Sequence, residues 1–231
     1  QVMDQAELED TIRQAFKIAS SGRPGPVLID IPKDVQMNQV VKQVPIMLPT
    51  AQAPMTNSAH FRDAFALLQN ATKPMFYIGG GVDSAGATDE LRTLLQHCQL
   101  PAVSTLKGLG SVPADYPLNL GMLGMHGNAG ANLAVQDCDL LIALGARFDD
   151  RVTGKLASFA PNAKVLHIDI DNSELNKLRQ VQLAINCDLG TALPLFQNEC
   201  AALNVNVMDK WQPWREQCSA LKSENAWQYD C

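Results

Sequence analysis

The sequence predicts an α/β fold with a doubly wound parallel sheet flanked by helices, and two observations support this prediction. Short runs such as Met75–Ile78 and Leu140–Leu144 are apolar at every position rather than at alternate ones, which is typical of strands covered on both faces. Segments with apolar residues at helical spacing separate these runs, as at Phe61–Leu68 and Leu91–Cys98. Strands that alternate with helices form parallel sheets with right-handed crossovers.

The first 36 residues predict a helix, a turn and a strand, which are together too small to form a domain. One face of the helix carries Leu8, Ile12, Ala15, Phe16 and Ala19. Gly22 suits the left-handed position after the helix, and the apolar run Val27–Ile31 predicts a strand. Residues 37–54 contain three prolines and no helical period, so they predict an interdomain linker.

Residues 55–205 hold the predicted sheet domain. Its first helix is capped at Asn57 or Ser58. The later elements are a strand at Met75–Ile78, a helix at Leu91–Cys98, a strand at Pro101–Ser104, a helix at Ala131–Gln136, and strands at Leu140–Leu144 and Val165–Asp169. Residues 206–231, which carry Trp211, Trp214 and Trp227, predict a helix that needs a further surface to pack on.

The composition excludes several classes of function. The chain has 18 basic and 24 acidic residues, a net charge of −6, without a basic cluster, which argues against nucleic-acid binding. No apolar run approaches the length of a membrane span and no secretory signal opens the chain, so we expect a cytoplasmic protein. The six cysteines and four histidines are dispersed without C-x-x-C pairs, so reduced thiols and no metal site are expected.

A glycine turn follows the first strand of the predicted domain, where ligands bind in open parallel sheets. Gly79–Gly81 begin a G-x-G-x-x-S pattern, with Ser84 in the place of a third glycine. Such a turn allows the close approach of a phosphate. A bare tight turn explains the glycines equally well, since the dinucleotide pattern is incomplete.

A charged loop follows the most apolar strand of the chain. Arg147 and Arg151 are separated by three residues and can offer forked donors to a pyrophosphate. The alternative is that the two arginines pair with Asp149 and Asp150 on a solvated loop. At the end of the next strand, Asp169 is a candidate for hydrogen bonds to ribose hydroxyls.

The sequence does not decide the roles of two further segments. Asp171 is predicted to cap a helix that begins at Ser173. The loop Met122–Gly127 is apolar and contains His126; it either covers the core or forms a polarisable wall against a flat ring. No nucleophile with its base and no catalytic motif is found, so the motifs indicate binding without chemistry.

Four strings, Ser21–Val35, Gly121–Gly127, Gly145–Lys155 and His167–Asp171, together resemble the acetolactate synthase (acetohydroxyacid synthase) family over essentially all of the chain. The match is closest to the large catalytic subunits of bacteria. It implies a thiamine diphosphate enzyme that joins two 2-oxo acids in branched-chain amino-acid synthesis. Residues 1–36 would end a pyrimidine-binding domain, 55–205 would be a Rossmann-like central FAD-binding domain, and 206–231 would lead into a pyrophosphate-binding domain.

The resemblance also implies which residues bind FAD in a non-redox role. Loops after the strands would hold its phosphates and flavin, and the acids further along would hold its adenosine. The positions are Arg23, Gly79, Gly80, Gly81, Thr105, Leu106, Lys107, Leu123, Gly124, Met125, His126, Gly145, Ala146, Arg147, Asp149, Arg151, Val152, Asp169, Ile170, Asp188 and Leu189. Those matching the border of the substrate channel are Lys33, Met125, Asp150 and Arg151.

The same resemblance places the residues for thiamine diphosphate and Mg²⁺ in flanking domains, so these 231 residues alone are predicted to be inactive. It implies 2-oxo acid substrates (pyruvate, then pyruvate or 2-oxobutyrate), a homo-oligomer and a small regulatory subunit. Cys187 stands where the family usually has glycine. The alternatives are a relative such as pyruvate oxidase or glyoxylate carboligase, a stand-alone NAD-binding or sirtuin-like module, and a structural spacer without ligand.

Overall fold

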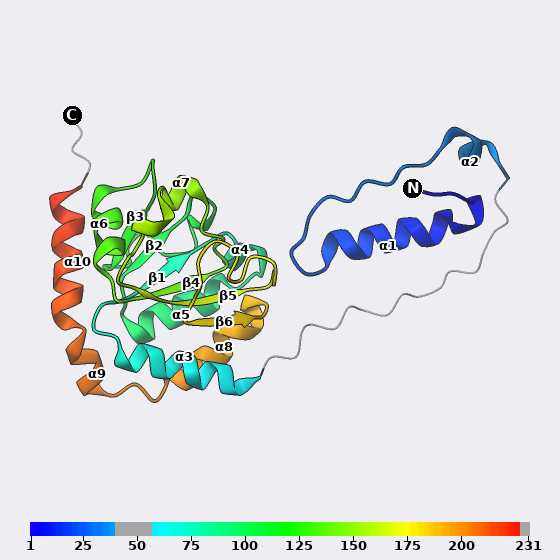
Figure 1. Ribbon diagram of the computed structural model, residues 1–231. Coiled ribbons are helices and arrows are strands. Elements are labelled where there is room, and N and C mark those ends of the chain that lie inside the picture. Colours follow the sequence, from blue (N-terminus) through cyan, green and yellow to red (C-terminus); the bar gives the residue numbers. More distant parts are fainter. Residues whose placement is uncertain (40–56, 227–231) are drawn as a thin grey trace. The chain divides into compact units, whose positions relative to one another are not determined.

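The chain divides into two compact units, Gln1–Ala53 and Pro54–Cys231. A computed structural model describes residues 1–39 and 57–226 (Figure 1). Most of the predicted linker, residues 40–54, lies outside the described residues.

The first unit is helical, with η1 (Gln5–Glu7), α1 (Leu8–Ser20) and α2 (Lys33–Met37). The predicted first helix is confirmed, and Gly22 follows its end with φ +57°. The strand predicted at Val27–Ile31 is wrong: no strand forms there, and Leu28 is 91% exposed. A strand requires a hydrogen-bonded neighbour. The bonds described for this run are from the Val2 N–H to the Asp30 carbonyl, at 2.9 Å, and from the Gln36 side chain to the Ile31 carbonyl, at 2.6 Å, and these do not form the ladder of a strand pair.

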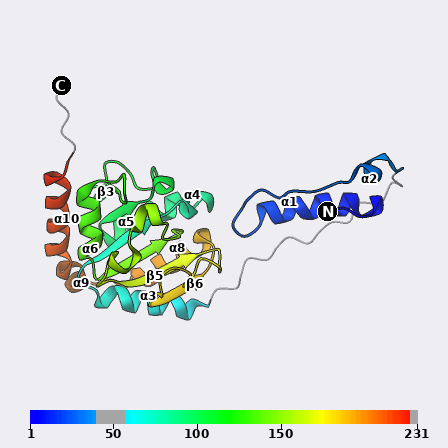
Figure 2. The same ribbon diagram turned by 45° about the horizontal axis from the view of Figure 1, so that its top comes forward.

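The second unit contains a six-stranded parallel sheet of order β3-β2-β1-β4-β5-β6 (Figure 1). Figure 2 shows β3 towards one end of this sheet and β5 and β6 towards the other. Its strands are β1 (Pro74–Ile78), β2 (Ala102–Ser104), β3 (Asn119–Met122), β4 (Leu140–Leu144), β5 (Lys164–Asp169) and β6 (Leu183–Asn186). The predicted parallel sheet is therefore confirmed. The sequence did not predict β3 and β6, because these edge strands are only partly buried and β3 contains Gly121.

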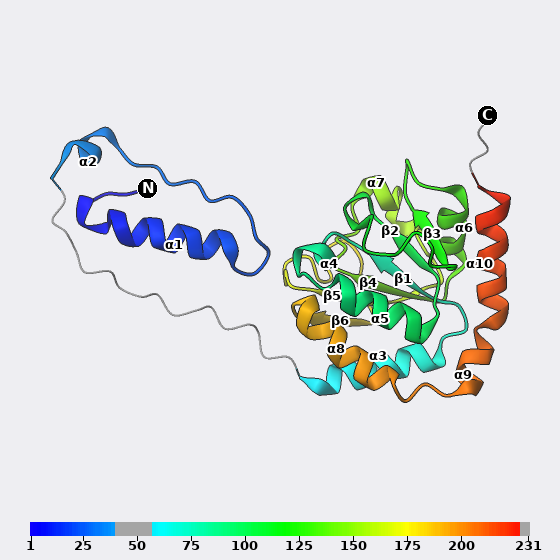
Figure 3. The same cartoon turned by 180° about the vertical axis from the view of Figure 1, so that it is seen from behind.

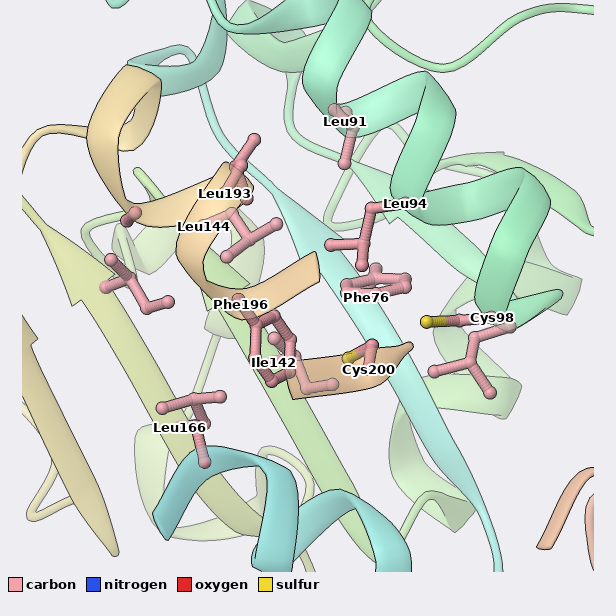
Figure 4. Close-up of a cluster of buried hydrophobic side chains, with 14 of the residues drawn as sticks. Phe76, Leu91, Leu94, Cys98, Ile142, Leu144, Leu166, Leu193, Phe196 and Cys200 are labelled. Atoms are coloured by element: carbon pink, nitrogen blue, oxygen red, sulfur yellow. The ribbon is translucent and has the colours of Figure 1, made fainter. Parts of the chain in front are cut away.

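Helices cover both faces of the sheet. One face packs against α3 (Ser58–Asn70), α5 (Thr88–Cys98) and α8 (Leu189–Cys200) (Figure 3). Figure 4 shows Phe76, Ile142 and Leu166, from three neighbouring strands, in the cluster formed with Leu94 and Phe196. The other face packs against α6 (Ala129–Asp137) and α10 (Gln212–Glu224). The shorter elements are α4 (Gly81–Ser84), η2 (Leu106–Gly108), α7 (Asp150–Thr153), η3 (Leu156–Ser158) and α9 (Val205–Lys210).

The tail packs on the sheet domain itself. Trp211 and Trp214 are buried, and their indole N–H groups donate to the carbonyls of Ala71 at 3.0 Å and Pro74 at 2.9 Å. Residues of 206–226 therefore contribute to both hydrophobic clusters of this unit, and the domain boundary at residue 205 stays a prediction. Trp227 lies outside the described residues. That 206–231 lead into a further domain stays a prediction.

No helix within 1–39 or 57–226 is long and apolar enough to cross a membrane. In the same residues, no group of three or more His, Cys, Asp or Glu side chains could hold a metal ion. Cys98, Cys138, Cys200 and Cys218 are buried free thiols. Cys187 is buried as well, and Cys231 lies outside the described part. Burial raises the pKa of the Cys138 thiol to about 12.

Candidate cofactor-binding site

The strand order reverses between β1 and β4, and the loops that leave these two strands meet at the carboxyl edge. The Gly79 N–H donates to the Leu144 carbonyl at 2.9 Å, and the Gly81 N–H donates to the Gly145 carbonyl at 3.1 Å. The Gly145 N–H in turn donates to the Ile168 carbonyl at 2.9 Å. In an open parallel sheet, ligands bind in the crevice at such a reversal.

The glycines at this reversal allow backbone to pack against backbone. A Cβ on Gly79 would lie 1.9 Å from the Gly145 oxygen, and one on Gly81 would lie 2.6 Å from the Gly145 Cα. Gly145 itself has φ +59°. The tight-turn interpretation of Gly79–Gly81 thus has a full structural explanation, and phosphate binding there stays a prediction.

The segment Thr105–Lys107 lies beside the glycine turn. The Thr105 N–H donates to the Ile78 carbonyl at 2.8 Å, directly at the end of β1. A Cβ on Gly80 would lie 2.8 Å from the Lys107 Cβ. Leu106 and Lys107 expose their side chains, so an apolar group and a cation stand at this end of the edge.

The loop Leu123–His126 has one buried and one exposed part. Leu123 is buried in the core, whereas Met125 and His126 are exposed. Asn132 fixes Gly124 by two hydrogen bonds, accepting from its N–H at 2.7 Å and donating to its carbonyl at 3.0 Å. Leu123 thus covers the core, whereas the interpretation of Met125 as part of a wall against a flat ring stays a prediction.

The loop after β4 turns on Phe148. This residue is buried with φ +55°, and its ring packs edge-on against Tyr77, with centroids 5.4 Å apart. Burial raises the pKa of Tyr77 further above its usual range. With Phe148 pointing inward, Arg147 lies exposed, while Ala146 is buried and Val152 is half-buried.

Asp149 organises the charged part of this loop. Its carboxylate accepts from the Arg151 N–H at 3.1 Å, which caps α7, and from the Arg147 guanidinium at 2.8 Å. The Arg151 N–H and the Arg147 cation hold the pKa of Asp149 below its usual range. The predicted Arg147–Asp149 ion pair is present, and half of the Arg147 side chain still faces solvent.

Asp169 and Asp188 lie at the ends of β5 and β6. The Asp169 carboxylate accepts from the Asp171 N–H at 2.8 Å. The Asn186 side chain donates to the carbonyls of Asp169 and Ile170, at 3.0 and 2.8 Å, which ties the two strand ends together. Asp188 caps α8 through the Gly190 N–H at 2.9 Å. Half-buried Ile170 and Asp188 thus border Asp169.

One position differs from what the sequence predicts, and two neighbouring ones are buried. Leu189 is buried in the core, and its contact with FAD stays a prediction. Cys187 is buried as well, and its N–H donates to the Asp169 carbonyl at 3.1 Å. No helix begins at Ser173, because Asp171 bonds the Ser173 N–H at 3.0 Å in a turn that does not propagate.

Arg23 and Lys33 belong to the first unit, where Arg23 follows α1 and Lys33 begins α2. Their predicted contacts with FAD and with the substrate channel stay predictions. Asp150 and Arg151 are exposed on α7. An open depression lies elsewhere, before the amino end of β5, and its lining residues are Leu156, Ala157, Phe159, Pro161, Leu178 and Arg179.

Comparison with known proteins gives the family. The model of the family "Thiamine pyrophosphate enzyme, central domain" matches residues 61–195, which include the whole sheet. The chain belongs to the thiamine pyrophosphate enzymes. Its match to their central domain agrees with the six parallel strands between two layers of helices.

The related proteins are acetolactate synthase large subunits, as the resemblance implied. The isozyme 2 large subunit of Escherichia coli K12 is 50% identical over 225 residues, which are 97% of this chain and 39% of that subunit. The large subunit of Parasynechococcus marenigrum is 50% identical over 197 residues, which are 83% and 32%. A probable chloroplastic acetolactate synthase 2 of rice is 41% identical over 232 residues, 96% and 34%. The chain thus spans roughly a third of its relatives' length.

Sequence reasoning missed three side chains that shape this thiamine enzyme domain at its carboxyl edge. Phe148 adopts positive φ, which no pattern in the sequence signals for a bulky residue. His167 is buried on β5, and Asn186 bridges two strand ends. Asn186 follows an apolar run, which is the one signal that could have identified it.

Proposed function

We propose that this chain is the central, FAD-binding part of an acetolactate synthase catalytic subunit. The whole enzyme would condense pyruvate with a second pyruvate or with 2-oxobutyrate, releasing CO₂, in valine, leucine and isoleucine biosynthesis. The identity of 50% with an acetolactate synthase large subunit, over 97% of this chain, is the observation that carries the proposal.

The residues at the carboxyl edge fit an extended dinucleotide. Lys107, Arg147 and Arg151 expose cationic side chains suited to a diphosphate. Leu106 and Met125 are 69% and 66% exposed, and such apolar groups suit the flat face of a flavin. The Thr105 N–H donates to the Ile78 carbonyl at 2.8 Å, which joins the loop of Lys107 to the end of β1, and the Gly79 N–H donates to the Leu144 carbonyl at 2.9 Å, which joins the ends of β1 and β4. These loops are therefore neighbours, and a single ligand could contact several of them.

FAD would act here as a bound scaffold, since joining two 2-oxo acids with loss of CO₂ involves no net oxidation. Arg147 would bind its diphosphate, and Asp169 would bind its ribose. Asp150, Arg151 and Met125 would border the substrate channel with Lys33; the Met125 N–H donates to the Arg151 carbonyl at 2.9 Å, so these two loops are neighbours. Thiamine diphosphate and Mg²⁺ would be held by parts of the enzyme outside these residues.

The proposed enzyme is a cytoplasmic homo-oligomer that binds a small regulatory subunit. Within the described residues of this chain, neither the sequence nor the structure identifies a nucleophile with its base. We therefore expect the isolated chain to form no acetolactate from pyruvate, thiamine diphosphate and Mg²⁺. Acetolactate detected with the purified chain would contradict this expectation.

Titration of the purified 231-residue chain with FAD tests the cofactor proposal. We expect a saturable change of flavin fluorescence that excess NAD does not reverse. Competition by NAD would favour the stand-alone NAD-binding module instead. A response that does not saturate would favour the spacer without ligand and would remove FAD from the proposal.

A further inference from the structure

His167 is a buried polar side chain that the fold leaves incompletely bonded. It lies on β5 with 1% of its surface exposed. In the part of the chain that the structure describes, its Nε2 atom is buried without a hydrogen-bond partner. Buried polar atoms in native proteins are nearly always paired, so this nitrogen calls for a functional explanation.

The neighbour of this nitrogen is Asp169, two residues later on the same face of the strand. The His167 Nε2 and the Asp169 Oδ2 are 3.8 Å apart, which is too long for a hydrogen bond. The Phe148 ring meets the imidazole edge-on, with centroids 5.2 Å apart at 86°, and so restricts its rotation. A shift of the carboxylate by about 1 Å would bring the pair to hydrogen-bond distance.

The hydrogen-bonding capacity of the carboxylate defines what the pair can bind. A carboxylate offers about two acceptor sites on each oxygen. The Asp171 N–H occupies one site on Oδ1 at 2.8 Å. If His167 occupies one site on Oδ2, each oxygen keeps one site, which matches the two vicinal hydroxyls of a ribose. The Asp169 side chain is 11% exposed, so a ligand can reach it from the open edge.

We propose that His167 is a positioning residue for the adenosine end of the cofactor. Its Nε2–H donates to Asp169 Oδ2 when ligand is bound, and the carboxylate held between His167 and the Asp171 N–H accepts from both ribose hydroxyls. The inference rests on the proposed FAD site, and it adds the residue that fixes the orientation of the ribose-binding acid.

A pair of polar substitutions separates positioning from mere packing. His167→Gln keeps an N–H donor close to the Nε2 position, whereas the shorter His167→Asn does not reach it. The matched control is His97→Gln on α5, where the Nε2 contacts the Cys200 carbonyl at 2.9 Å. Each variant of the 231-residue chain is titrated with FAD and then with ADP and 2′-deoxy-ADP as competitors, and its thermal midpoint is measured.

We expect the wild type, His97→Gln and His167→Gln to prefer ADP over 2′-deoxy-ADP about ten-fold, and His167→Asn to lose most of that preference. Equal preferences in the two His167 variants would overturn the inference and leave the FAD site standing. Failure of the wild type to bind FAD would overturn both.

Nuclear magnetic resonance of the wild type tests the same point without a variant, in case the substitutions unfold the chain. Addition of ADP to a chain that binds FAD should shift the ¹⁵N–¹H signal of His167 Nε2 to that of a hydrogen-bonded proton. An Nε2 signal that does not change at saturating ADP would overturn the inference.

Discussion

A side chain on Gly79 would overlap the carbonyl oxygen of Gly145, because the ideal Cβ position is only 1.9 Å from that oxygen. The two residues leave the carboxyl ends of β1 and β4, the strands between which the sheet order reverses. The carboxyl edge therefore depends on contact between two backbones that no other residue type permits at this distance.

Gly79→Ala should destabilise the domain by about 3 kcal/mol or more, since rigid backbone must move to admit the methyl group. The matched control is Gly86→Ala, whose Cβ would enter open space and whose φ of +63° costs only about 1 kcal/mol. Urea unfolding measures both. An equal decrease in the free energy of unfolding of the two variants would show that the contact with Gly145 does not contribute to stability.

Trp214→Phe should cost about 2 kcal/mol, because it removes buried volume and the indole donor to the Pro74 carbonyl. Ser219→Ala, at an exposed position of the same helix, should change the free energy of unfolding by less than about 0.5 kcal/mol. Thermal and urea unfolding provide the measurements. If the Trp214 variant unfolds like the wild type, α10 is not part of the cooperative unit.

The Lys73–Asp137 ion pair should contribute stability above acidic pH. Lys73 and Gln217 both donate to Asp137 Oδ2 at 2.6 Å and lower the pKa of that carboxyl, with the Lys73 bond as the larger cause. A lowered pKa in the folded state stabilises the protein above the unfolded value of about 3.9, and this contribution is lost as the pH falls towards the folded value.

Asp137→Asn should therefore lose at most about 1 kcal/mol at pH 7, because the pair is partly exposed and screened by solvent. The difference from the wild type should shrink below about pH 4. Asp115→Asn, on an exposed loop, serves as the control. Urea unfolding at pH 7 and at pH 3 measures the effect, and a difference that grows in acid would contradict the assignment.

Arg147→Ala should weaken FAD binding about ten-fold, because a guanidinium that is 56% exposed would no longer reach the diphosphate. The affinity of the wild type should also fall with added salt, and the variant should show a smaller decrease. Lys164→Ala, at the amino end of β5, should bind FAD as the wild type does. Loss of affinity in both variants alike would indicate an unspecific effect of charge.

The sequence predicted the central strands because neighbouring residues such as Ile142 on one face of the sheet and Leu141 on the other are both buried, which leaves an uninterrupted apolar run. It missed β3, where Gly121 and partly exposed positions remove that run. It predicted a strand at Val27–Ile31 from the same apolar signal, but a strand also depends on a neighbour, which the run itself does not encode.

The candidate site was predictable as a set of loops, since every loop after a parallel strand reaches the same edge. Its internal geometry was not. The burial of Phe148 with positive φ decides that Arg147 is exposed, and this depends on aromatic partners far apart in the sequence. The sequence likewise does not indicate the packing role of Gly79, because this role depends on the contact with Gly145, which is distant in the sequence.

The two buried indoles impose an order on how the polypeptide acquires its structure during translation. Trp211 and Trp214 bond carbonyls that lie 140 positions earlier, at the start of the first strand of the sheet. After the ribosome has synthesised this strand, it must still synthesise the intervening residues before the two indoles can complete the core. Until then the nascent chain exposes apolar surface, which makes it a substrate for chaperones.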